Sequence, residues 1–174
     1  MWNRNIETFL GCDCSYEDSH IVIFGAPFDS TTSYRPGTRF ASRTMRAETY
    51  SPDQDLDLEA ACVFDGGDLE LPFGDTERAL DMIRMYTREI LQGGKLPLLI
   101  GGEHLVSLPA IEAAANMYPE LSIIHFDAHT DLREEYLGNR FSHATVIRRV
   151  WDKLGDGRIH QFGIRSGART EWEW

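Results

Sequence analysis

The 174-residue chain lacks a long apolar run, a secretory signal and an excess of basic residues. None of its apolar stretches approaches the roughly 20 residues that a membrane-spanning helix needs. The first residues show no cationic start followed by an apolar core, so no signal peptide is predicted. Lys and Arg number 17 against 28 Asp and Glu, a formal charge of −11 that disfavours nucleic acid and anionic membranes as partners.

Cysteine is also scarce. The three cysteines, Cys12, Cys14 and Cys62, cannot all pair, and a reducing cytoplasm is the simpler location for such a chain. Cys12 and Cys14 could bind a soft metal, but no second cysteine pair completes the usual four-ligand site. We therefore expect ordinary surface thiols.

The residues that are present describe a folded α/β protein. The length predicts one domain over residues 1–174, and continuous apolar runs predict buried parallel strands near 20–25, 96–100 and 121–126. Shorter strands are expected at 60–64 and 158–164, with an acidic loop at 53–59 and no closing helix. A helix is predicted near Ser42, and further helices are predicted after caps at Asp75 or Thr76, at Ser107 and at Ser142. The helix after Asp75 carries an apolar stripe of Ala79, Ile83, Tyr86 and Ile90. The alternation favours a parallel sheet with helices on both faces.

Candidate metal ligands follow the predicted strand at 121–126. Asp127, His129 and Asp131 occupy alternating positions, and alternate side chains of an extended chain share one face. Carboxylates mixed with an imidazole suit Mn(II), Zn(II) or Fe(II), and the excess of carboxylate favours Mn. The same residues could instead cap the strand and begin a turn.

A second loop carries His104, just after the predicted strand at 96–100. Ligands gather at the carboxyl ends of parallel strands, so we expect His104 to join Asp127, His129 and Asp131 around one metal site.

Two further histidines, His125 and His143, lie near these candidate ligands in the sequence. His143 follows the predicted cap Ser142, and the helix dipole there disfavours the imidazolium form. It fits a proton shuttle near a metal-bound water, or a residue that helps to cap its own helix. His125 lies inside the predicted strand and is more typical of a hydrogen-bonded core group than of a ligand.

Four ordered blocks resemble the ureohydrolase (arginase/agmatinase) family. They read G-G-E-H-L-V-S-L-P at 101–109, I-I-H-F-D-A-H-T-D-L-R at 123–133, G-A-P-F-D-S-T-T-S-Y-R-P-G-T-R-F at 25–40 and F-S-H-A-T-V-I-R-R at 141–149. The second block matches the family's Asp-Ala-His-x-Asp motif in full. Glu103, Leu105 and Ala144 depart from the family's Asp, Ser and Gly.

The resemblance implies a two-manganese site in which a metal-bridging hydroxide attacks a guanidinium carbon and releases urea. By position, His104, Asp127 and Asp131 would hold one Mn, and His129 would hold the other with Asp127 bridging. His143 matches the family histidine that shuttles protons or steadies the departing amine. The pair of cations would supply hydroxide near neutral pH.

The preferred substrate is agmatine, which would be converted to putrescine in polyamine biosynthesis. Arginases read an α-carboxylate with an Asn- and Ser/Thr-rich stretch, whereas residues 132–142 read L-R-E-E-Y-L-G-N-R-F-S, which suits an amine better. Guanidinobutyrase and arginase activities are the alternatives. The resemblance also implies a homo-oligomer.

Family members run longer and carry a later Asp-x-Asp motif, and then a Glu that meets the guanidinium. The sequence ends before either, so we expect the C-terminal part of the fold to be missing and four of six ligands to be present. The sequence is then either part of a longer protein or a natural truncation, and for a natural truncation weak metal binding and little or no activity are predicted. The alternative from another class is a non-catalytic interaction fragment.

Overall fold

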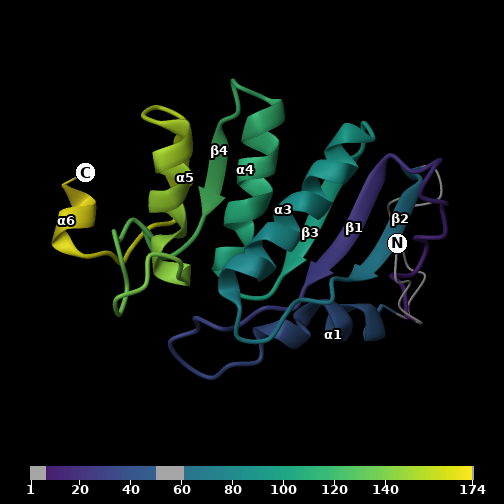
Figure 1. Ribbon diagram of the computed structural model, residues 1–174, viewed down its shortest axis with the longest axis horizontal. Helices are drawn as coiled ribbons and strands as arrows, with labels where there is room; N and C mark the ends of the chain where they lie inside the picture. The colour runs from purple at the N-terminus through teal and green to yellow at the C-terminus, as the bar shows by residue number, and fades with distance from the viewer. Residues whose placement is uncertain (1–6, 50–60, 174) are drawn as a thin grey trace.

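The computed structural model describes residues 7–49 and 61–173, and strands alternate with helices along the chain (Figure 1). The strands are β1 (Ile21–Ala26), β2 (Val63–Asp68), β3 (Leu96–Gly101), β4 (Ile123–Phe126) and β5 (Ile159–Phe162). The helices are α1 (Ala41–Ala47), α3 (Thr76–Gln92), α4 (Ser107–Met117), α5 (Val146–Leu154) and α6 (Arg169–Trp172), with 3₁₀ turns η1 (Thr38–Phe40), η2 (His104–Val106) and η3 (His143–Thr145). The expected acidic loop at 53–59 lies outside the described residues.

Every pairing between these strands is parallel, which confirms the predicted α/β class. The strands form two sheets, with the orders β2-β1-β3 and β4-β5. Figure 1 shows β1, β3 and β4 pointing the same way, so both sheets end on the same side of the molecule. In the part of the chain that the structure describes, β3 and β4 do not pair with each other.

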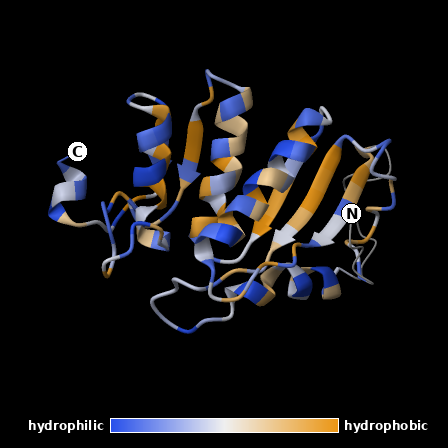
Figure 2. Ribbon diagram, viewed as in Figure 1, coloured by the Kyte–Doolittle hydropathy of each residue, from blue (hydrophilic) through white to orange (hydrophobic). Residues whose placement is uncertain are grey.

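The core lies between the strands and α3, α4 and α5, which cover one face of the two sheets (Figure 1). Figure 2 shows β1, β3 and β4 among the most apolar segments of the chain. Val22 and Phe24 of β1 are completely buried, as are Ile83 and Ile90 on the predicted stripe of α3. Tyr86 completes that stripe, with its ring centroid 4.9 Å from that of Phe24.

Two of the predicted helix caps are present. The Asp75 carboxylate accepts a hydrogen bond from Arg78 N at 3.0 Å, and Ser142 forms a capping box with Thr145, although it opens η3 rather than α5 directly. Helix α4 begins at Ser107 and ends at Met117 as expected, but Ser107 does not cap it. A 3₁₀ turn precedes α4, and Glu103 caps that turn by accepting from Leu105 N at 3.2 Å.

Strand β2 is longer than predicted, because it includes the Asp-Gly-Gly-Asp segment at 65–68. The buried Arg46 of α1 donates to both oxygens of Asp65 at 2.8 Å and to Asp68 at 2.5 Å. These bonds pair the charges inside the protein, which is how buried ions are tolerated. The expectation of no closing helix is wrong, because the short helix α6 follows β5.

The cysteines differ from the sequence-based expectation of surface thiols. Cys14 and Cys62 form a disulfide with their Cα atoms 5.3 Å apart, and Cys12 is buried. Burial raises the pKa of the Cys12 thiol to about 11, so this thiol is protonated at neutral pH. The pairing depends on two segments 48 residues apart, which spacing alone could not relate.

The sheet face opposite α3, α4 and α5 carries exposed apolar side chains. Five residues of β3, β4 and β5 share this exposure: Leu96, Leu98, Ile124, Phe126 and Phe162. The rings of Phe126 and Phe162 pack against each other, 5.5 Å between centroids. Among the described residues, no helix is long and apolar enough to cross a membrane.

Candidate metal centre

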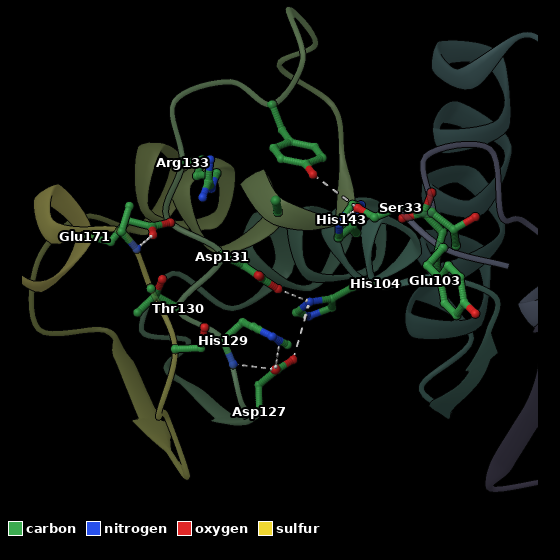
Figure 3. Close-up of a pocket in the computed structure, with 17 residues that line it drawn as sticks. Ser33, Glu103, His104, Asp127, His129, Thr130, Asp131, Arg133, His143 and Glu171 are labelled. Atoms are coloured by element: carbon green, nitrogen blue, oxygen red, sulfur yellow. Dashed lines mark hydrogen bonds and ion pairs between the residues drawn. The ribbon is translucent and has the colours of Figure 1, made fainter. Parts of the chain in front are cut away.

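A cavity of about 540 Å³ opens at the carboxyl ends of β3 and β4. The cluster of predicted metal ligands forms one of its walls, and His143 lies on another (Figure 3). Parallel α/β folds bind their ligands in the loops on this side of the sheet. The loops after β3 and β4 therefore meet where the sequence predicted.

His104 reaches the cavity because the chain turns tightly after β3. A Cβ atom on Gly102 would lie 1.8 Å from the Phe28 carbonyl oxygen, so only glycine fits there. Glu103 N donates to that carbonyl at 2.8 Å and fixes the turn against β1. His104 then begins η2, and its ring stacks on that of His125 in β4.

The second loop does not continue the strand, contrary to the extended-chain argument. Strand β4 ends at Phe126, and Asp131 adopts a left-handed backbone with φ of 51°. Asp127 Oδ1 accepts from His129 N at 2.8 Å, which leaves Oδ2 directed at the cluster. A folded turn, and not side-chain alternation, brings Asp127 and Asp131 together.

The four clustered residues are His104, His125, Asp127 and Asp131, whose ligand atoms all lie within 4.8 Å of one another. His104 Nδ1 lies 2.6 Å from Asp131 Oδ2 and 3.7 Å from Asp127 Oδ2 (Figure 3). Imidazole nitrogens with carboxylate oxygens fit Mn(II), Zn(II) or Fe(II). His125 Nε2 is buried without a hydrogen bond, so the cluster holds an unsatisfied polar atom.

Burial shapes the charges of this cluster. It lowers the pKa of His125, and the neighbouring His104 lowers it further, so the His125 ring is neutral at pH 7. Burial raises the pKa of Asp127, but the backbone N–H of His129 and the charge of His104 outweigh it, and the net pKa lies below the ordinary value. Asp127 is therefore an anion that can receive a cation.

His129, the fourth predicted ligand, lies beside the cluster rather than within it. Its side chain is 65% exposed, and its Nδ1 lies 3.4 Å from Asp127 Oδ1. That oxygen is the one away from His104. His129 thus lies on the outer side of Asp127.

His143 is held on the opposite wall by a polar network. Its Nε2 lies 3.1 Å from Ser33 Oγ, and its backbone N–H donates to Thr31 Oγ1 at 3.0 Å. The Thr31 hydroxyl in turn donates to Glu103 at 2.5 Å, and the Tyr136 ring packs edge-on against the imidazole. Sequence reasoning missed Thr31, Ser33 and Tyr136, although the Ser and Thr residues in the block at 25–40 were a signal for polar contacts by Thr31 and Ser33.

The segment at 132–142 differs from its expected use. Glu134 pairs with Arg148 and Arg149 at 3.0 Å, and its pKa is lowered by the hydrogen bond from Arg149. The residues of this segment that line the cavity are Arg133 and Tyr136. The acidic side chain of Glu134 is thus not the group that would meet an amine.

Fold and site together define a parallel α/β protein with a candidate metal centre between two loops at the carboxyl ends of its strands. A comparison with protein families matches residues 19–174 to the arginase family. The chain belongs to the arginase family, which confirms the resemblance of its four sequence blocks.

Individual relatives agree with this. An agmatinase of Bacillus anthracis is 50% identical over 173 residues, which cover 97% of this chain and 60% of that relative. The crystal structure of the agmatine ureohydrolase of Thermoplasma volcanium matches with a TM-score of 0.85 at 36% identity, covering 98% of this chain and 59% of that one. Proclavaminate amidino hydrolase from Streptomyces clavuligerus matches with a TM-score of 0.81 at 30% identity, covering 95% and 58%. The chain spans about 60% of the length of the curated agmatinases of Bacillus anthracis and Bacillus cereus.

Proposed function

We propose that this chain carries the metal-binding part of an agmatinase-like ureohydrolase, which hydrolyses agmatine to putrescine and urea. The observation that carries the proposal is the cluster of His104, Asp127 and Asp131, which shares a cavity with His143. The relatives at about 50% identity are named agmatinases, which supports a guanidino substrate.

Two Mn ions are the proposed cofactors. His104, Asp127 and Asp131 would hold one, and His129 would hold the other, with Asp127 shared. The mixture of carboxylates and imidazoles fits this ion. Bound cations would lower the pKa of a water molecule to about 7 and so supply the nucleophile.

A side chain of this protein would then deliver the proton that the departing amine needs. Hydrolysis adds water to the guanidinium carbon, breaks the bond to the substrate amine and delivers a proton to that nitrogen. We assign this delivery to His143, because the hydrogen bonds to Thr31 and Ser33 keep its ring at the cavity wall. Its role follows the general logic of a positioned histidine acid.

The choice of agmatine rests on the relatives and not on Glu134, which is paired with arginines. The test is urea release by the Mn²⁺-loaded protein from agmatine, arginine and guanidinobutyrate in parallel. Agmatine should be turned over fastest, and faster turnover of arginine would contradict the assignment.

Metal binding is tested separately by Mn²⁺ titration calorimetry. His104→Ala and Asp131→Ala should each weaken binding at least tenfold, because each removes a ligand. His160→Ala is the matched control, since this histidine of β5 is exposed and outside the cluster. Equal binding by all variants would refute the assigned site.

A non-catalytic interaction role is the second candidate, and the exposed apolar face of β3, β4 and β5 favours it. Mn²⁺ binding without urea release from any of the three substrates would support this role.

We further propose a homo-oligomer located in the cytoplasm, with the acidic charge of −11 disfavouring nucleic acid and membranes. Light scattering of the purified protein measures the assembly.

A further inference from the structure

His125 is the one member of the cluster whose role the ligand pattern leaves open. Its ring is stacked on His104, 5.1 Å between centroids and 21° between planes, and its Nε2 lies 3.3 Å from Asp127 Oδ2. A histidine in this place can act as a metal ligand through a bare Nε2, or as a hydrogen-bond donor through Nε2–H. The two roles require opposite tautomers.

Gln161 of β5 decides between them. It is the cross-strand partner of His125 in the parallel pair, and its side-chain Nε2 lies 2.9 Å from His125 Nδ1. The same Nε2 also donates to the Thr130 backbone carbonyl oxygen at 2.9 Å. A carbonyl oxygen only accepts, so the group facing it must be the NH₂ and not the amide oxygen.

The second hydrogen of that NH₂ therefore points to His125 Nδ1. A ring nitrogen that accepts from an amide carries no proton itself, so the single proton of a neutral ring lies on Nε2. That nitrogen is buried, faces the cluster and makes no hydrogen bond to another described residue. A nitrogen that carries this proton has no lone pair for a cation, and it lies 3.3 Å from Asp127 Oδ2.

We propose that Gln161 fixes His125 as an Nε2–H donor, which makes His125 a positioning residue for the Asp127 carboxylate and excludes it from metal ligation. Oδ1 of Asp127 is held by the His129 backbone, and His125 constrains Oδ2 from the other side. The role of His125 in positioning Asp127 for a metal rests on the proposed function. The tautomer of His125 does not, because it is a property of the metal-free chain.

The test is a long-range ¹H–¹⁵N correlation spectrum of the metal-free, ¹⁵N-histidine-labelled 174-residue protein, with His125 assigned from the signal missing in His125→Asn. This spectrum distinguishes protonated from bare ring nitrogens. The wild type should show a bare Nδ1 and a protonated Nε2 on His125. A proton on Nδ1 would overturn the proposal.

Substitution of Gln161 tests the cause. Gln161→Glu places an acceptor beside Nδ1 and should move the proton to that nitrogen, whereas Gln161→Met should give both tautomers. Gln92→Met, an exposed position at the end of α3, is the matched control and should leave His125 unchanged. A wild-type pattern in both Gln161 variants would refute the assignment to Gln161. If Gln161→Glu does not fold, Gln161→Met and the wild type still decide.

Zn²⁺ added to saturation tests the exclusion from ligation. His125 should keep its Nε2 proton while the His104 signals shift, and loss of that proton would overturn the proposal. If no Zn²⁺ binds, the metal centre under the proposed function fails, while the tautomer measured in the metal-free protein still decides the present inference.

Discussion

Thr31 connects two walls of the cavity through a single hydroxyl group. It donates to Glu103 and accepts from the His143 backbone, so Thr31→Val leaves a buried carboxylate and a backbone N–H each short of a partner. We expect a loss of about 1–3 kcal/mol in the free energy of unfolding, since charged hydrogen bonds are involved. Chemical denaturation measures it. Thr31→Ser keeps the hydroxyl and should stay close to the wild type, and an equal loss in both variants would contradict this account.

Asp29 should make the stability of the fold depend on pH. Its pKa lies below the ordinary value, mainly because Arg39 donates a hydrogen bond to it, and Gly37 N adds another at 2.8 Å. A carboxyl whose folded pKa is depressed stabilises the fold above its unfolded pKa, and that stability is lost as pH falls through the folded pKa. When the pH is lowered from neutral to below about 4, the free energy of unfolding of the wild type should therefore fall more than that of Asp29→Asn. Denaturation at several pH values compares them, and parallel curves would exclude the linkage.

At the scale of elements, Arg46 joins α1 to β2. The side chains of Arg46 and Asp65 are almost fully buried, so Arg46→Leu leaves the Asp65 charge without its partner. Breaking a buried pair in this way costs about 3–5 kcal/mol. Thermal and chemical unfolding should show that loss. Arg43→Leu on the exposed side of the same helix is the control and should change stability little. A small effect of Arg46→Leu would mean that water reaches Asp65.

Elements were predictable from sequence where their signals are local. The buried run of β1, the stripe of α3 and the caps at Asp75 and Ser142 depend on neighbours within a few residues, and the structure confirms them. The continuation of β2 was not predictable, because it depends on Arg46 some 19 residues away. Ser107 failed as a cap because a 3₁₀ turn satisfies the start of α4 instead.

The candidate site follows the same division. His104, Asp127 and Asp131 could be placed together because strand ends converge in a parallel fold. The partner of His125 could not, since Gln161 meets it only through the register of β4 and β5. The exposure of His129 could not be predicted either, because it depends on the turn at Asp131, and the prediction assumed an extended chain there.

For the whole molecule, the disulfide between Cys14 and Cys62 closes a loop of 48 residues in the unfolded chain. Loop-closure entropy then gives about 4 kcal/mol of stabilisation. Unfolding with and without a thiol reductant should show a loss of that order, and Cys14→Ser should reproduce it without reductant. An unchanged midpoint under reduction would mean that the pair is not formed in solution.

The cluster of candidate ligands extends across the two sheets. His104 follows β3 of one sheet, and Asp127 and Asp131 follow β4 of the other, while α4 packs between α3 and α5 to join the two halves. A cation coordinated from both sides would bind only the arrangement in which the halves stay together. By thermodynamic linkage, the affinity for that cation and the equilibrium between joined and separated halves change by the same factor. Substitutions in the α4 packing, far from any ligand atom, would thus tune how tightly the cation is held.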